Sequence, residues 1–263
     1  MDVVVTGVGK TYPDGTEVLK GLDLQIASGE GVVLLGANGC GKSTLLRCML
    51  GLETLSKGDI QLGGLSIQKQ KGRNLRRLRS RIGSVFQQFN LVGNLSVFQN
   101  VLFGRLGNDG LLLSLNLSCS RANRELAMHC LERVGLAHLA GKRTDSLSGG
   151  QQQRVAIARM LMQDVQIVFA DEPVASLDPR AGREVMDLLF EIVHERKLTV
   201  ICVLHQLELA TEYAQRLVGL KQGRVVMDCS PDRVTESELA ALYEVASMED
   251  LEQSFAEGAA YVS

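Results

Sequence analysis

The sequence predicts an α/β fold, in which a parallel sheet carries an inserted helical region. Continuous apolar runs at Gly31–Leu35, Val165–Ala170 and Leu198–Leu204 are typical of buried parallel strands. Between the first two runs, from about Gln88 to Met162, helical patterns dominate. The strand content is therefore divided around a helical insert.

The remaining elements follow in chain order. Before the insert, further strands are expected at Asp2–Gly7, Val18–Ile26 and Asp59–Ile67, with a strand "GSVF" that ends at Phe86. A helix is expected from Lys42 to about Gly51. The later helices are expected at Asn123–Val134, Gln151–Met162 and Arg180–Arg196.

These patterns predict a core of about residues 1–87 and 164–230, a helical subdomain of about 88–163, and a tail of 231–263. The tail carries eight acidic residues against one basic residue. Thr235 and Glu238 have the spacing of a capping box. We expect the tail to be helical and peripheral.

Composition limits the class of protein. The chain has 263 residues, 45% of them hydrophobic and 22% charged, which is ordinary for a globular protein with a full core. Its formal net charge of −2 argues against a general polyanion-binding protein. No apolar run approaches the ~18 residues that span a bilayer, and the start "MDVVVTGVGK" lacks the pattern of a secretory signal.

The cysteine spacing indicates in which compartment the protein resides. The six cysteines include no C-x-x-C pair, so they are interpreted as reduced thiols rather than as a disulfide framework or zinc site. The sequence therefore predicts a cytoplasmic protein. The cysteines are Cys40, Cys48, Cys119, Cys130, Cys202 and Cys229.

A glycine-rich loop carries the strongest chemical signal. The pattern Gly36-x-x-x-x-Gly41-Lys42-Ser43 follows a predicted strand and opens a predicted helix, as in a P-loop. Its glycines allow backbone amides to surround a β-phosphate. Lys42 supplies a positive charge to the β- and γ-phosphates, and Ser43 offers a hydroxyl to Mg²⁺. The alternative is a glycine-rich turn without a ligand, which this strand–loop–helix context disfavours.

An acidic pair follows a second apolar strand, in "VQIVFADEP". Asp171 is expected at the carboxyl end of that strand, where open α/β sheets bind ligands, and would hold Mg²⁺ through water. Glu172 would orient or deprotonate an attacking water. A helix-capping turn is the alternative, and the P-loop favours the catalytic interpretation.

A second anion-binding signal lies in "TDSLSGGQQQRVAIARM", where two glycines precede a helix. Together with the P-loop, Gln87, Asp171-Glu172, Ser176-Leu177-Asp178 and His205, this segment resembles ATP-binding-cassette ATPases from about Val3 to Asp228. The resemblance implies a P-loop NTPase core with an antiparallel β subdomain and an inserted helical subdomain, together the ATP-binding domain of residues 1–230.

The resemblance also implies how the two signals cooperate. In this family two copies pack head to tail, and the LSGGQ segment of one closes over the ATP in the P-loop of the other. Ser148, the amides of Gly149 and Gly150, and the start of the helix at Gln151 would then act in trans as a second clamp on the γ-phosphate.

The other family roles are carried over residue by residue. Gln87 is similar to the glutamine that senses Mg²⁺ and water, and His205 to the histidine that contacts the γ-phosphate. Asp178 is expected at the subunit interface and Tyr12 on the adenine. The implied catalytic residues are Glu172, His205 and Gln87, and the Mg²⁺ ligands are Ser43, Gln87 and Asp171. The implied ATP-binding residues are Tyr12, Gly36, Asn38, Gly39, Gly41, Lys42, Ser43, Thr44, Ser148, Gly149, Gly150, Gln151 and Asp178.

Two features leave alternatives open. Cys40 lies inside the P-loop, where it is either a small packing residue or an oxidisable thiol near a helix N-terminus. The insert Gly104–Met128, with its apolar cluster Leu111–Leu117, is either a contact for a membrane permease or internal packing.

Several segments narrow the resemblance to the ATP-binding subunits of bacterial phosphonate importers, a group that includes phosphite-type systems. These are "FQQFNLVGNLSVFQNVLFGRLG", the long insert that follows it, "LSGGQQQRVAIARMLMQ", "ADEPVASLDP" and "LHQLELA". The resemblance implies a second copy of the chain, two permease subunits and, indirectly, a periplasmic substrate-binding protein as partners. It implies a peripheral position on the cytoplasmic face of the inner membrane.

Other functions compete with this one. The basic run Lys69–Arg81 has seven Lys or Arg residues and no acid, as in cassette ATPases that act on nucleic acid. A solvated helix face is the preferred interpretation, because aromatic residues are absent from the run, so no nucleic acid partner is expected. An importer or exporter ATPase for another solute, and a regulatory nucleotide-binding protein, are further alternatives.

Overall fold

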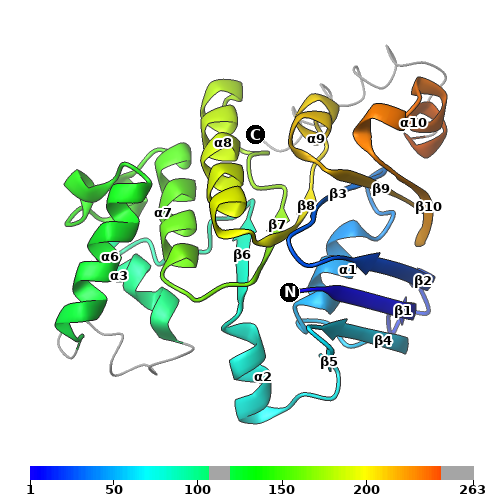
Figure 1. The fold of residues 1–263 in the computed structure, drawn as a ribbon, viewed down its shortest axis with the longest axis horizontal. Coiled ribbons are helices and arrows are strands. Elements are labelled where there is room, and N and C mark those ends of the chain that lie inside the picture. The colour runs from blue at the N-terminus through cyan, green and yellow to red at the C-terminus, as the bar shows by residue number, and fades with distance from the viewer. Residues whose placement is uncertain (107–118, 244–263) are drawn as a thin grey trace. The chain divides into compact units, whose positions relative to one another are not determined.

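The computed structural model describes residues 1–106 and 119–243, which fall into two compact units (Figure 1). The first unit comprises Met1–Lys71, Phe169–Glu172 and the chain from Lys197 onward. The second comprises Gly72–Val168 and Pro173–Arg196. The mixed α/β architecture predicted from the sequence is confirmed.

An antiparallel sheet in the first unit has the strand order β2-β1-β4-β5. The strands are β1 (Val3–Thr11), β2 (Glu17–Ile26), β4 (Lys57–Leu62) and β5 (Leu65–Ser66). The single strand predicted at Asp59–Ile67 is therefore wrong. Gly63 and Gly64 have φ angles of 56° and 74°, a left-handed conformation that turns the chain back on itself and separates β4 from β5.

The second sheet of this unit is mainly parallel. β3 (Gly31–Leu35) pairs in parallel with β8 (Thr199–Val203) and β9 (Arg216–Lys221), and all residues of β3 and β8 are buried, as their apolar runs predict. Strand β7 (Ile167–Asp171) follows β8 in the strand order, and its last residues, from Phe169, belong to this unit. The edge strand β10 (Arg224–Cys229) is antiparallel to β9.

The helices of the first unit are α1 (Lys42–Met49), α9 (Leu207–Tyr213) and α10 (Glu236–Tyr243). The predicted capping box opens α10: Glu238 N donates to Thr235 Oγ1 over 3.3 Å, and Thr235 N donates to Glu238 Oε2 over 3.0 Å. Within the predicted tail, the structure forms an α-helix over Glu236–Tyr243, and the residues after Tyr243 lie outside the described part of the chain.

The second unit is mostly helical. Helix α7 contacts α3, α6, α8 and β6 through a stripe of small and branched residues, and Val155, Ile157 and Ala158 are fully buried. Its elements are α2 (Gly72–Arg79), β6 (Ile82–Phe86), α3 (Val97–Leu102), α6 (Arg121–Arg133), α7 (Gly149–Leu161) and α8 (Pro179–Arg196).

Residues 72–79 of the basic run form α2, whose arginines are exposed and whose buried residue is Leu78, as a solvated helix face requires. The absence of a nucleic acid partner stays a prediction. The cluster Leu111–Leu117 lies outside the described residues. Within 1–106 and 119–243, no helix is both long and apolar enough to cross a bilayer.

Candidate functional site

The glycine-rich loop runs from the end of β3 to the start of α1, and two glycines fix its path. Gly36 has a φ of 140°, and a Cβ there would lie 2.1 Å from the carbonyl oxygen of Leu220. Gly41 has a φ of 115°, and its Cβ would lie 2.9 Å from Leu19 Cδ2. A side chain at either position would clash with its surroundings, so the loop conformation requires glycine.

The loop ends at a helix N-terminus that is open to an anion. The N-cap residue is Gly41, which provides no side-chain hydrogen bond to the first turn, and that turn contains no acidic residue. The first amides of α1 and the positive end of its dipole are therefore not neutralised by the helix itself. Such an N-terminus can bind phosphate.

Lys42 places a positive charge inside this loop. The side chain is buried, and Nζ donates to the carbonyl oxygens of Gly36 over 2.6 Å and of Ala37 over 3.2 Å. Burial lowers the pKa of the Lys42 ammonium, while the nearby carboxylates of Asp171 and Glu172 favour the charged form. The loop thus combines backbone amides with a buried ammonium.

Asp171 ends β7 beside the loop. Ser43 Oγ donates to Asp171 Oδ1 over 3.2 Å. Burial raises the pKa of Asp171, and the Ser43 hydrogen bond opposes the shift. A hydroxyl and a carboxylate are hard oxygen donors that suit Mg²⁺, which usually takes few protein ligands and completes its shell with water and substrate phosphates. No cluster of three or more His, Cys, Asp or Glu that could hold a metal occurs in 1–106 and 119–243.

Glu172 follows in a strained conformation. Its φ of 50° is left-handed, at a cost of about 1–3 kcal/mol for a residue other than glycine. Its carboxylate contacts His205, which follows β8: Glu172 Oε1 lies 2.6 Å from His205 Nε2. This hydrogen bond lowers the pKa of Glu172, so the group is a carboxylate that can accept a proton or orient water.

The first unit therefore brings together the P-loop, Asp171, Glu172 and His205 at the carboxyl ends of β3, β7 and β8. Tyr12 lies in the same unit, just after β1, with Lys10 Nζ 4.9 Å from its ring centroid. All six cysteines are free in this structure. Cys40 is buried, and its sensitivity to oxidants stays a prediction.

The LSGGQ segment opens α7 in the second unit. Ser148 is the N-cap: its Oγ accepts from Gln151 N over 3.4 Å, while Gln151 Oε1 accepts from Ser148 N over 3.1 Å. This reciprocal pair is a capping box. Gly149 packs tightly, since a Cβ there would lie 2.9 Å from Leu177 Cδ2.

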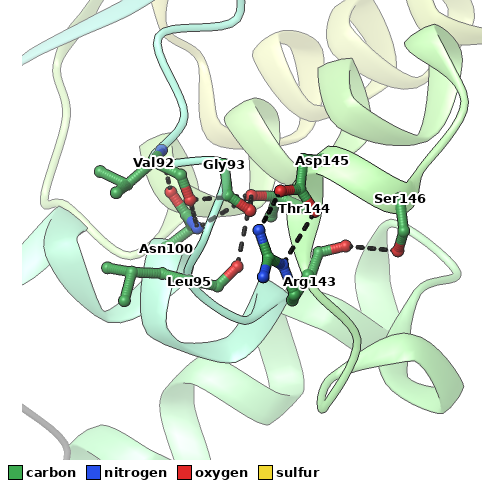
Figure 2. A network of polar contacts seen from close by, with 8 residues as sticks. All are labelled: Val92, Gly93, Leu95, Asn100, Arg143, Thr144, Asp145 and Ser146. Atoms are coloured by element: carbon green, nitrogen blue, oxygen red, sulfur yellow. Dashed lines mark hydrogen bonds and ion pairs between the residues drawn. The ribbon is translucent and has the colours of Figure 1, made fainter.

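A buried polar network holds the chain just before this segment (Figure 2). Thr144 Oγ1 donates to the carbonyl oxygen of Val92 over 2.9 Å, and Asn100 Nδ2 donates to the same oxygen over 3.1 Å. Thr144 N and Asp145 N donate to the carbonyl oxygens of Leu95 and Gly93. The loop after β6 is thereby joined to the loop that leads into Ser148.

A residue that sequence reasoning missed lies one turn into α7. Gln153 is fully buried, and its Nε2 donates to the carbonyl oxygens of Pro173 over 2.5 Å and Phe86 over 3.3 Å. Phe86 precedes Gln87, and Pro173 follows Glu172 in the chain. A glutamine on the apolar stripe of a predicted helix, four residues after Gly149, was the available signal.

Gln87 and Asp178 belong to the second unit with the LSGGQ segment. Gln87 directly follows β6 and is partly exposed. Asp178 is exposed, and its Oδ1 accepts from Ala181 N over 3.0 Å at the start of α8. The residues predicted to meet ATP thus divide into a charged set in the first unit and a largely uncharged set in the second.

Known proteins with similar sequences belong to a family of transporters. The model of the ABC transporter family matches residues 19–175. A phosphonates import ATP-binding protein of Shouchella clausii is 46% identical over 248 residues, covering 94% of this chain and 93% of that protein. A phosphate-import ATP-binding protein of Mycolicibacterium smegmatis is 49% identical over 242 residues, covering 92% of each.

A solved structure is similar in fold as well. It is a dimeric, post-hydrolysis state of the ATP-binding cassette MJ0796 bound to ADP and Pi. The TM-score is 0.75 at 34% sequence identity, over 87% of this chain and 98% of that chain.

Proposed function

The chain is an ATPase that belongs to the ABC transporter family, and we propose that it energises an importer for phosphonate-type or phosphite-type anions. One observation carries the proposal. The P-loop lysine, a carboxylate that suits Mg²⁺ (Asp171) and the hydrogen-bonded pair of Glu172 and His205 occur together in one unit. Relatives named for phosphonate or phosphate import align with more than nine-tenths of the chain. The ATP-binding domain would span about residues 1–230, followed by the tail 231–263.

The residues of the first unit have separable roles. The P-loop amides and Lys42 bind the β- and γ-phosphates, with Tyr12 against the adenine. Ser43 and Asp171 would hold Mg²⁺, with Gln87 of the second unit as a further expected ligand, and the ion would supply positive charge at the phosphates. Glu172 orients water and accepts its proton, since the His205 hydrogen bond keeps the carboxylate ionised. His205 also contacts the γ-phosphate.

The second unit completes the site of another copy. Ser148, Gly149 and Gly150 of one subunit approach the γ-phosphate held by its partner, with Gln151 and Asp178 at the interface. A two-fold dimer then contains two equivalent ATP sites. Hydrolysis cuts the anion that joins the subunits and so weakens their contact. The dimeric structure of MJ0796 supports this arrangement.

The dimer would act through other proteins. We expect it to bind two permease subunits on the cytoplasmic face of the membrane, through the helical subdomain. A periplasmic binding protein would deliver the solute to the permease, so this chain itself would not contact the solute.

Uptake in cells lacking the gene tests the proposal. We expect labelled methylphosphonate or phosphite to enter only when wild-type protein is restored, and a Lys42→Ala variant not to restore uptake. Labelled phosphate is measured in parallel, because one relative is named for phosphate import. Restoration of phosphate uptake alone would assign the importer to phosphate, and failure to restore any of the three would refute the proposed solute class.

A further inference from the structure

The last described helix, α10, is fixed against the strand that borders the P-loop. Leu239 and Leu242 are buried, and Leu242 packs on Gly219 of β9, where a Cβ would lie 3.2 Å from its methyl groups. Lys221 Nζ donates to the carbonyl oxygen of Ala241 over 2.7 Å. Apolar contact and a cation at the last turn thus hold this helix end beside β9 (Figure 1).

This attachment brings Tyr243 to the first residue of the P-loop. The Tyr243 hydroxyl accepts a hydrogen bond from Gly36 N over 3.2 Å. Burial raises the pKa of Tyr243 to about 12, so the hydroxyl stays neutral at physiological pH. A residue more than 200 positions along the chain therefore provides the partner of a buried loop amide.

Gly36 is consequently held on both sides. Its N–H is bound by Tyr243, and its carbonyl oxygen accepts from Lys42 Nζ over 2.6 Å. Between these two groups lies the φ of 140° that turns the chain out of β3. If the N–H lost its partner, Gly36 could rotate, and the following amides and Lys42 would turn with it.

We infer that Tyr243 is a positioning residue for ATP binding: through Gly36 it holds the P-loop in the conformation that receives phosphate. The inference rests on the proposed role of the P-loop and assigns a function to the C-terminal helix. A loop that is ordered before binding loses less conformational freedom when the ligand binds, which raises affinity without a new ligand contact. A second tie, from Gly223 N to the carbonyl oxygen of Cys40 over 3.0 Å, remains when the first is removed.

Tyr243→Phe in the full-length protein tests the inference. The variant keeps the ring and removes only the hydroxyl. We expect the Kd of a fluorescent ATP analogue and the KM for ATP to rise about five-fold, because the loop must be ordered on binding, while kcat stays within about two-fold. Hydrogen exchange at Gly36 should become faster. Tyr213→Phe, at the end of α9, is the matched control and should leave the Kd unchanged.

The outcomes separate the inference from the proposed function. If Lys42→Ala abolishes analogue binding and Tyr243→Phe retains the wild-type Kd, the inference is wrong and the P-loop assignment stands. If Lys42→Ala binds normally, the P-loop assignment itself fails. A Tyr243→Phe protein that melts earlier but binds normally has lost only a structural contact, which also overturns the inference. If it does not fold, Lys221→Gln loosens the same helix end, and an unchanged Kd in that variant counts as refutation.

Discussion

Two helix N-termini in this protein carry glycine-rich sequences, and they differ in how their amides are satisfied. The N-terminus of α1 begins at Gly41, receives no side-chain cap and has Lys42 as its first residue. The N-terminus of α7 begins at Ser148, which closes a capping box with Gln151. The first amides of α1 therefore have no side-chain acceptor from the helix itself, whereas the start of α7 is capped by its own side chains.

The difference explains a division of labour. The α1 terminus combines dipole, amides and a buried ammonium, and can therefore capture a polyanion alone. The α7 terminus contributes only neutral groups from Ser148, Gly149 and Gly150. Neutral donors add to an anion that another group already holds, as the proposed closure over a partner's ATP would require. Altering the two termini separately should therefore affect different steps.

The largest effect is expected at the charged terminus. Lys42→Ala removes the only side-chain charge on the P-loop, so kcat/KM for ATP should fall by about 10³-fold and nucleotide binding should weaken strongly. Steady-state ATPase kinetics and analogue titration measure the change. Near-normal kinetics in this variant would show that α1 does not grip the phosphates.

The next effect separates chemistry from binding in the same unit. Glu172→Gln keeps the shape and an acceptor for His205 but cannot take a proton, so kcat should fall by about 10²-fold. ATP should still bind and accumulate in a stable dimer. Rapid-quench turnover and light scattering measure the two quantities. Unchanged turnover would remove Glu172 as the catalytic carboxylate.

A smaller effect is expected at the neutral terminus. Ser148→Asp and Ser148→Asn both retain an N-cap acceptor, so α7 should remain capped in both variants. Aspartate also faces the partner's phosphates with a negative charge, and its ATPase rate should fall roughly tenfold below that of the asparagine variant. ATP affinity of the monomer should match wild type for both. Equal rates would argue against a phosphate beside Ser148.

The smallest effect on ATP chemistry is expected in the network before Ser148. Thr144→Val removes the hydrogen bond from Oγ1 to the carbonyl oxygen of Val92, which keeps the bond from Asn100 Nδ2. The expected cost is therefore that of one hydrogen bond, about 0.5–1.5 kcal/mol in stability. Urea unfolding should show this loss, and the ATP affinity of the monomer should stay unchanged. A variant as stable as wild type would mean that this network contributes little to holding the loop.

Local sequence patterns predict much of the fold and of the candidate site. The apolar run of β3, the strand end at Asp171 and the cap between Thr235 and Glu238 depend on neighbouring residues, so they are readable in the sequence. The turn at Gly63 and Gly64 is also local, but it lies inside a continuous strand pattern that predicts a single strand.

Long-range contacts account for what the sequence did not reveal. The contact of Tyr243 with Gly36 joins segments 207 residues apart, and no local spacing indicates it. The two carbonyl partners of Gln153 likewise become evident only in the folded chain. The strand pair β9 and β10 was missed as well, although Gln222 and Gly223, both with positive φ, mark its turn.

The sharing of each ATP between two copies is tested most directly by mixing two variants with low ATPase activity. Lys42→Ala has a normal LSGGQ segment, and Ser148→Asp has a normal P-loop. In a mixed dimer one site is doubly damaged and the other is intact. If the sites are shared, random mixing should restore roughly a quarter of the wild-type ATPase rate. If each copy completes its own site, the mixture will be no more active than the sum of its two components.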